Sequence, residues 1–328
     1  MTSPNKRHHV FVAHGDRIIP PFGWGAVEQI IWQYSTRLRS RGISVHVINR
    51  RKYGAILEVL KLSLKGEADI VYCHAEKPVK ILTMIAKWRK FLLISTTHNP
   101  MTPERPDAEA LKALGRCCHA PFHFVGREDI VPLIHARNPS AICVLQFNAV
   151  EIKDFKTSPV GNGKAICVGR IQERKRQNET AHLLEGTGLA CDFIGPFMGD
   201  VVISDELRKQ MRGEWNRETI HGRLCDYSCL ILLSKSERQP LVVSEALAAG
   251  IPVVVSPDAA WNLDATKPYI FVVGSDNEVA NAVTEAIAVR DRFTAEIRKY
   301  AEDSFDYEVL IDDYLSQVEE WLTPKKVH

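Results

Sequence analysis

The sequence of 328 residues lacks long apolar runs. No run reaches the roughly 18 apolar residues that a transmembrane helix needs. The first residues, MTSPNKRHHVFVAHG, have too short an apolar core for a secretory signal. We therefore expect a cytoplasmic protein.

Cysteine pairs are also missing. Eight cysteines stand singly, apart from adjacent Cys117 and Cys118, and no C-x-x-C pair occurs. Neither a disulfide framework nor a structural zinc site is indicated, so we expect reduced cysteines in the core. His221, Cys225 and Cys229 are spaced to share one helix face, which leaves a metal site there as the alternative to buried packing.

Two nucleotide-binding signatures are absent or incomplete. No G-x-x-x-x-G-K-[ST] phosphate loop occurs. In PPFGWGAVEQ, Gly23 and Gly25 are present, but Glu28 replaces the third glycine of a dinucleotide fingerprint, and Gly23 lies far beyond Ala13, where the first strand should end. A nicotinamide dehydrogenase is therefore disfavoured. The glycines either let the backbone approach a ligand ahead of a helix or only form a turn.

What the sequence contains predicts a soluble α/β protein. It is 45% apolar and 25% charged, and short apolar runs alternate with amphipathic stretches, as in β-α units around a parallel sheet. The Pro/Gly-rich TSPVGNGK, residues 157–164, interrupts the alternation, so we predict two doubly wound domains, 1–156 and 160–303. The predicted strands are VFVA, ISVHVI, ADIVYC, FLLIST, FHFV and ICVL in the first domain and AICVG, LACDFIG, SCLILLS, IPVVVS and YIFVV in the second.

Charge is distributed unevenly. The first 155 residues hold 22 Lys and Arg against 13 Asp and Glu, whereas the remainder is acidic in balance. An anionic partner, such as a phospholipid surface or a phosphorylated acceptor, would suit the first half, and a basic surface that only confers solubility is the alternative. The segment KPVKILTMIAKWRKFLL, residues 77–93, could rest on an anionic membrane or form ordinary core structure. We expect no nucleic-acid partner.

Ligands of open parallel sheets lie beyond the carboxyl ends of the strands, so the candidate residues are those that follow strands. In SERQPLVVSEALAAG, Glu237 would follow a strand and Glu245 would lie in the next helix. The start of that helix, at Leu241 and Val242 directly after Pro240, would offer N–H groups to a phosphate, while carboxylates accept hydrogen bonds from sugar hydroxyls. The pattern suggests a nucleotide sugar, although each glutamate alone could be a solvated surface residue.

A basic cluster follows another strand. In KAICVGRIQERKRQ, Arg170 and Lys175 could clamp a diphosphate, and Arg174 and Arg176 are expected to face solvent. A wholly solvated basic face is the alternative.

Single polar residues follow three further strands. His74, His98 and Asn148 occupy these positions. A histidine there can hydrogen-bond a sugar hydroxyl or a developing charge, but a loop or core histidine is the alternative.

Taken in order, these segments resemble a known family. GWGAVE, THNP, FNAVEIKDF, VGRIQERK, FIGP, SERQPLVVSEALAAGIPVV and FDYEVLIDDYL are similar, over nearly the full chain, to the retaining GT-B glycosyltransferases of family four. The string S-E-x7-E-A-x-A-x-G-x-P-V-V is the most specific part. The resemblance implies two Rossmann-like parallel-sheet domains facing across a cleft. The second would hold the nucleotide sugar, the first most of the acceptor site, and a last helix, about 304–323, would pack back on the first.

The same resemblance implies roles for single residues. Glu245 matches the glutamate that holds the ribose, Glu237 the one beside the donor sugar's hydroxyls, and His98 a histidine near the reaction centre. Arg170 and Lys175 match the diphosphate clamp. The other matches are Gly25 and Ala26 in the loop that approaches the phosphates, Pro240, Leu241 and Val242 at the donor, and Asn148 in a turn between the domains.

Some positions depart from the family pattern. Ala26, Ala149 and Arg176 stand where glycine is common, and the interval from His221 to Ser236 looks short. The short interval leaves the base preference open.

The resemblance implies transfer of a sugar from a nucleoside diphosphate to an acceptor hydroxyl with retention at the anomeric carbon. A UDP-sugar is the first expectation and a GDP-sugar the second, the acceptor being a polysaccharide or lipid-linked precursor. Neither a metal nor another cofactor is expected. A non-catalytic nucleotide-sugar-binding module and a nucleotide-sugar epimerase stay open as alternatives.

Overall fold

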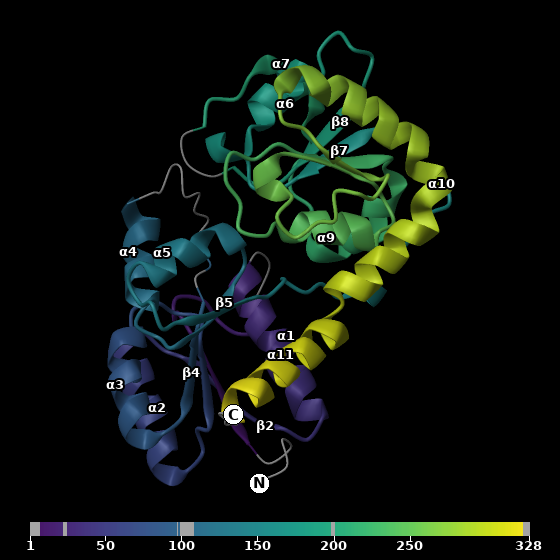
Figure 1. Cartoon of the computed structure of the whole chain (residues 1–328). Coiled ribbons are helices and arrows are strands. Elements are labelled where there is room, and N and C mark those ends of the chain that lie inside the picture. The colour runs from purple at the N-terminus through teal and green to yellow at the C-terminus, as the bar shows by residue number, and fades with distance from the viewer. Residues whose placement is uncertain (1–6, 22–24, 97, 99–107, 198–200, 324–328) are drawn as a thin grey trace. The chain divides into compact units, whose positions relative to one another are not determined.

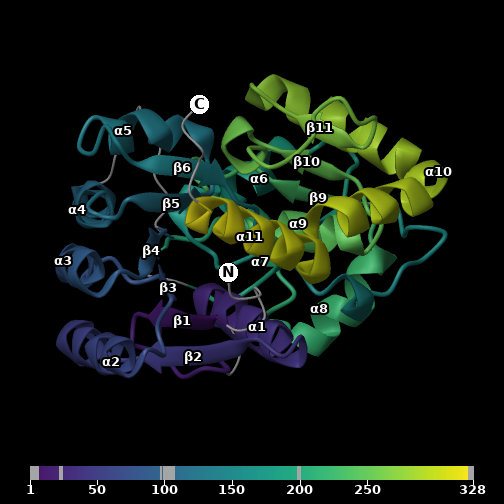
Figure 2. The ribbon, with the colours of Figure 1, turned by 60° about the horizontal axis from the view of Figure 1, so that its bottom comes forward.

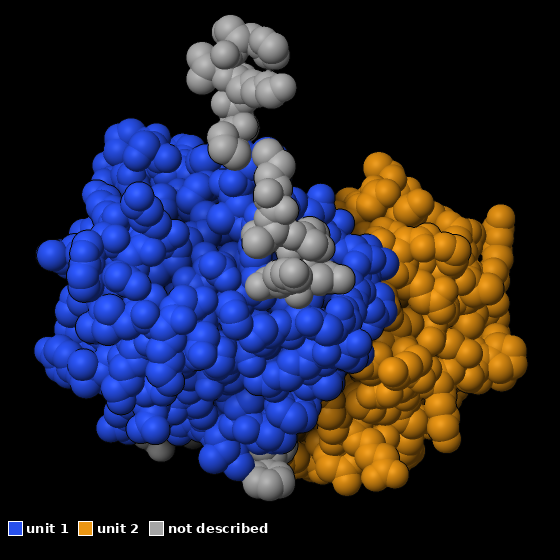
Figure 3. All heavy atoms as spheres, turned by 90° about the horizontal axis from the view of Figure 1, so that it is seen from below, with its two compact units in different colours: residues 1–146, 307–328 blue, residues 147–306 orange. Residues whose placement is uncertain are grey.

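The computed structural model describes residues 7–21, 25–96, 98, 108–197 and 201–323. The chain divides into two compact units, coloured separately in Figure 3. Unit 1 contains residues 1–146 and 307–328, and unit 2 contains residues 147–306. The expected linker at 157–164 therefore lies inside unit 2, directly before its first strand.

Unit 1 (Figure 1) is built on six parallel strands in the order β2-β1-β3-β4-β5-β6, all of which are labelled in Figure 2. All six coincide with predicted apolar runs, and the runs FHFV and ICVL match β5 and β6 residue for residue. The elements are β1 (His8–Ala13), α1 (Ala26–Ser40), β2 (Ser44–Asn49), α2 (Lys52–Lys65), β3 (Ile70–Cys73), α3 (Val79–Arg89), β4 (Leu92–Ser95), α4 (Ala108–Cys117), β5 (Phe122–Val125), α5 (Val131–His135), β6 (Ile142–Leu145) and α11 (Tyr307–Leu322).

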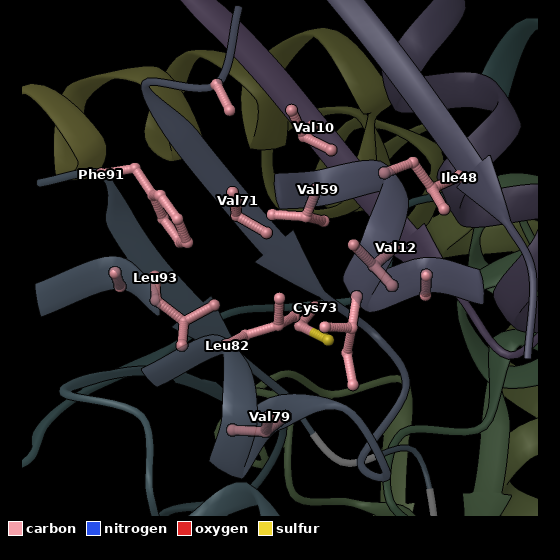
Figure 4. Packing of buried hydrophobic residues seen from close by; sticks show 14 of the residues in the cluster. Val10, Val12, Ile48, Val59, Val71, Cys73, Val79, Leu82, Phe91 and Leu93 are labelled. Carbon is pink, nitrogen blue, oxygen red and sulfur yellow. The ribbon is translucent and has the colours of Figure 1, made fainter. Parts of the chain in front are cut away.

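Alternation along β1 gives this sheet two buried faces. Val10 and Val12 enter the apolar cluster that α2 and α3 cover (Figure 4). Phe11, between them, points to the other face and contacts Tyr34 of α1 and Tyr314 of α11. Successive strand side chains point to opposite faces, which explains why a strand covered on both sides is apolar throughout. Figure 2 shows α2 and α3 on one side of the strands and α1 and α11 on the other.

Unit 2 holds five parallel strands in the order β11-β10-β9-β7-β8. All five coincide with predicted runs. The elements are β7 (Ala165–Val168), η4 (Glu173–Lys175), α6 (Gln177–Leu183), β8 (Cys191–Ile194), α7 (Asp205–Gln210), α8 (Arg217–Arg223), β9 (Cys229–Leu232), α9 (Leu241–Ala248), β10 (Val253–Val255), β11 (Ile270–Val272) and α10 (Val279–Phe305).

The cysteines lie in or near the cores, as predicted. Seven are buried and Cys143 is half-buried. The predicted helix face shared by His221, Cys225 and Cys229 is wrong, because α8 ends before Cys225 and Cys229 begins β9. Among the described residues, no group of His, Cys, Asp and Glu side chains could hold a metal ion.

Within the described ranges, no helix combines the length and apolar character needed to cross a bilayer.

Candidate functional site

In unit 2, the loops that follow β7 and β9 are joined. These strands are neighbours in a parallel sheet, so both loops leave the same edge. The Lys235 N–H donates to the Arg174 carbonyl over 2.8 Å. In return, the Arg174 guanidinium donates to the Ser236 carbonyl. Two segments distant in sequence are thereby fixed against each other.

Glu237 lies where the two loops meet. Its side chain is nearly buried, and its Oε1 lies 3.0 Å from Lys175 Nζ and 3.0 Å from the Arg174 guanidinium. Burial by itself would raise the pKa of Glu237, but the charges of Lys175 and Arg174 outweigh burial and lower it. The carboxylate is therefore ionised at neutral pH and binds two cations.

The contact of Glu237 with Arg174 corrects a sequence prediction. Arg174 does not simply face solvent, because the single turn η4 directs it back over the loop that carries Glu237. Arg176, which follows η4, has the left-handed φ of 57°, and its guanidinium pairs with Asp276 at 2.8 Å. Its head group is thus held by an ion pair on the surface.

Two glycines let the strand ends approach closely. Gly169 follows β7, and a Cβ atom there would lie 3.4 Å from Lys175 Nζ. Gly195 follows β8 with φ +145°, and its Cβ would lie 2.0 Å from the Gly169 carbonyl oxygen. Only glycine fits at position 195, and Arg170 leaves the sheet directly beside this contact. Arg170 and Lys175 therefore share one strand outlet.

Helix α9 begins at the end of the Glu237 loop. Pro240 precedes it, and Leu241 and Val242 form its first turn, where backbone N–H groups have no intrahelical acceptor. Glu245 lies about one turn further and is half-buried. Burial raises its pKa, and the positive charge of Arg217 partly counteracts this. The two glutamates thus differ: one is held ionised by contacting cations, and the other is destabilised as an anion by burial.

Asn148 supports the same loop. Its backbone N–H donates to the Gln239 side-chain oxygen over 2.6 Å, and its amide donates to the Gln239 carbonyl over 3.1 Å. Asn148 is the second residue of unit 2, directly after the point at which the chain leaves unit 1. These two hydrogen bonds hold the loop at Gln239 against Asn148.

In unit 1, the proposed phosphate loop is only partly described. Gly23 lies outside the described residues. Gly25 precedes α1, and Ala26 is the first residue of that helix. A Cβ at Gly25 would lie 3.0 Å from the Pro21 side chain and 3.2 Å from a carboxylate oxygen of Glu28, so the backbone passes close to its neighbours here.

His98 is paired with a second histidine. His74 follows β3 and His98 follows β4, which are adjacent strands. His74 Nδ1 lies 2.9 Å from His98 Nε2, and the ring planes differ by 9°. His74 is buried against Tyr72, at a ring-centroid distance of 4.2 Å. Because one nitrogen must donate and the other accept, the contact orients the His98 ring and couples its tautomer to that of His74.

Two residues near the glutamates escaped the sequence analysis. Arg174 was expected to face solvent, and no pattern in the sequence pointed to Arg217. The alternation of charges in QERKRQ gave no sign of a turn that brings Arg174 back to Glu237. Arg217 belongs to α8, and only the fold places its charge near Glu245.

Known structures resemble this chain in fold. It is similar to a sucrose-phosphate synthase from Thermosynechococcus elongatus, with 12% identity, 96% of this chain and 99% of that chain covered and a TM-score of 0.72. HepE from Anabaena in complex with UDP matches with 15% identity, 96% and 99% coverage and a TM-score of 0.70. The lipopolysaccharide outer core galactosyltransferase WaaB in its apo form matches with 17% identity, the same coverage and a TM-score of 0.73. The chain therefore has the GT-B fold. No protein-family model and no curated protein matches it.

Proposed function

We propose that the chain is a retaining glycosyltransferase of the family-four type that uses a nucleoside-diphosphate sugar. The contact of Lys175 with Glu237 carries this proposal. It places a cation suited to a phosphate beside an ionised carboxylate suited to sugar hydroxyls, at the edge of the sheet where such folds bind ligands.

The site residues would divide the work of donor binding and bond cleavage. Arg170, Lys175 and the first turn of α9 would stabilise the charge that develops on the leaving diphosphate. Glu237 would hold hydroxyls of the donor sugar, and Glu245 those of the ribose. The acceptor hydroxyl would attack from the face that the diphosphate leaves, with a phosphate oxygen as the base, so no protein nucleophile is assigned.

The residues of unit 1 are assigned to the same reaction. His98, oriented by His74, would hydrogen-bond the donor sugar near the anomeric carbon, and the backbone at Gly25 and Ala26 would approach the phosphates. These roles follow from the order of motifs along the chain.

The solved relatives favour a UDP-sugar. HepE has been crystallised with UDP and with UDP-glucose, and WaaB is described as a galactosyltransferase. A GDP-sugar is the second choice. We propose a cytoplasmic enzyme that needs no metal, because arginine and lysine would carry the positive charge at the diphosphate, and an acceptor that is a polysaccharide or lipid-linked glycan precursor.

Thermal unfolding with UDP-, GDP- and ADP-sugars tests donor binding directly. A ligand at about 100 times its Kd stabilises the folded state by about 2.7 kcal/mol, which raises the Tm measurably. Lys175→Met should abolish the shift, whereas Lys209→Met, at an exposed lysine of α7, should keep it. Measuring the release of free nucleotide from the sugar donor then distinguishes an enzyme from a non-catalytic binding module. If no nucleotide sugar raises the Tm and none is cleaved, the proposal fails.

A further inference from the structure

Helices α2 and α3 expose large apolar side chains on their outer faces. Tyr53 is 69% exposed and Leu57 57% exposed on α2, and Met84 is 68% exposed and Trp88 66% exposed on α3. With Leu64, these make up five of the thirteen large apolar residues exposed in the described parts of the chain. The inner faces of both helices already pack on the sheet, so the exposed residues are not needed for that core (Figure 4).

The exposed residues form two neighbouring stripes. Tyr53, Leu57 and Leu64 recur at helical spacing, and so do Met84 and Trp88. The helices lie side by side in Figures 1 and 2, and the Arg89 guanidinium donates to the Ser63 carbonyl over 2.7 Å. The apolar side chains therefore share one surface of unit 1.

Basic residues surround the stripes. Lys61 and Lys65 are exposed on α2, Lys80 and Lys87 are exposed on α3, and Lys77 is exposed just ahead of α3. Helix α3 carries no acidic residue, and α2 carries only Glu58. Among the described residues, neither Lys80 nor Lys87 takes part in an ion pair. The surface thus combines apolar side chains, two aromatic rings and a net positive charge.

This chemistry fits a lipid surface better than another copy of the chain. Amphipathic helices that lie on membranes place aromatic and aliphatic side chains at the acyl boundary and lysines at anionic head groups. A two-fold contact between copies would bring lysines against lysines, which opposes association. Exposed leucine and methionine side chains also make no hydrogen bonds or ion pairs with the phosphates of a nucleic acid.

We propose that the α2–α3 surface, defined by Tyr53, Leu57, Leu64, Met84 and Trp88 with the surrounding lysines, docks on an anionic lipid bilayer. Apolar insertion and charge attraction would act together. The proposal does not depend on the sugar donor.

Flotation with phosphatidylcholine vesicles, with and without phosphatidylglycerol, tests the proposal. The full chain should float with the anionic vesicles only, and added salt should weaken the binding. The double change Lys80→Glu, Lys87→Glu should weaken partitioning at least about 30-fold, and Met84→Ser, Trp88→Ser at least about 10-fold. The matched control is Val160→Ser, Val202→Ser, at two exposed apolar residues of unit 2, and should float as the unchanged chain does.

Three results would overturn the proposal. The first is that the unchanged chain does not float with anionic vesicles. The second is that the control variant loses as much binding as the α2–α3 variants. The third is that the chain forms a dimer without lipid and that Met84→Ser, Trp88→Ser abolishes this dimer. Thermal unfolding of each variant with and without UDP distinguishes loss of the surface from loss of the fold or of donor binding.

Discussion

Lys175 Nζ lies 3.0 Å from Glu237 Oε1, so the cation proposed for the diphosphate already has a carboxylate partner. Arg174 binds the same oxygen at 3.0 Å. The glutamate therefore orients both cations and also neutralises part of their charge. An incoming diphosphate would compete with Glu237 for these groups, which makes nucleotide binding and sugar transfer respond differently when the carboxylate is removed.

Glu237→Gln should separate binding from turnover. The amide keeps the shape of the side chain but removes a negative charge near the proposed diphosphate, so UDP should bind about 5-fold more tightly. Sugar transfer should fall by at least about 100-fold, because the charged acceptor for the sugar hydroxyls is lost. Titration calorimetry with UDP and a nucleotide-release assay measure the two effects. Glu185→Gln, at an exposed glutamate of unit 2, is the control, and weaker UDP binding by the Glu237 variant would contradict the assignment.

Arg170→Ala should reduce turnover by about 10²–10³, which is typical of losing one donor to a transition-state charge. The fold should survive, because Arg170 is only partly buried, so near-identical thermal unfolding is expected. Steady-state kinetics give kcat for this variant and for Arg208→Ala, whose side chain is 71% exposed on α7. Equal kcat values in both variants would remove Arg170 from the diphosphate site.

The sequence predicted the strands well and the contacts between loops poorly. FHFV and ICVL were predicted to the residue because short, largely apolar runs between turn residues are typical of the strands of a parallel sheet, although ICVL forms the partly exposed edge strand β6. The partnership of Arg174 with Glu237 could not be predicted, since it depends on one 3-10 turn and on which strands are neighbours. The pairing of His74 with His98 depends in the same way on the adjacency of β3 and β4. The shared helix face expected for His221 and Cys225 failed because periodicity gave no sign that α8 ends at Arg223.

Arg290→Leu should destabilise unit 2 strongly. The Arg290 side chain is fully buried in α10, and its guanidinium donates to the carbonyls of Tyr227, Ser158 and Cys225 over 3.0–3.2 Å. Leucine would leave these carbonyls without their donor, so we expect the free energy of unfolding to fall by about 3–5 kcal/mol. Urea unfolding measures this loss.

The matched control for that experiment is Arg292→Leu, at an exposed arginine of the same helix. It should change the free energy of unfolding by less than about 0.5 kcal/mol. Similar losses in the two variants would show that the buried hydrogen bonds of Arg290 are not the cause.

Stability should also fall in mild acid because of two buried histidines in unit 1. His9 Nδ1 lies 2.9 Å from the Tyr314 hydroxyl, and His123 Nε2–H donates to the Ala120 carbonyl over 3.0 Å. Burial is the main cause that lowers the pKa of each histidine to about 4. At pH values between the unfolded pKa of about 6.5 and this folded value, the unfolded chain binds protons that the folded chain does not. The free energy of unfolding is therefore retained above about pH 6.5 and decreases as the pH falls towards about 4.

Each histidine should contribute about 3 kcal/mol to this loss when the pH has fallen to about 4. Carboxylates titrate over part of the same range, so the comparison must be made between variants rather than with the unchanged chain alone. In urea unfolding, His9→Gln and His123→Gln should each lose less stability between neutral and mildly acidic pH than the unchanged chain does. His182→Gln, at a histidine whose side chain is 78% exposed, should lose as much stability over this pH range as the unchanged chain does. Parallel pH profiles for all three variants would show that the buried imidazoles are not responsible.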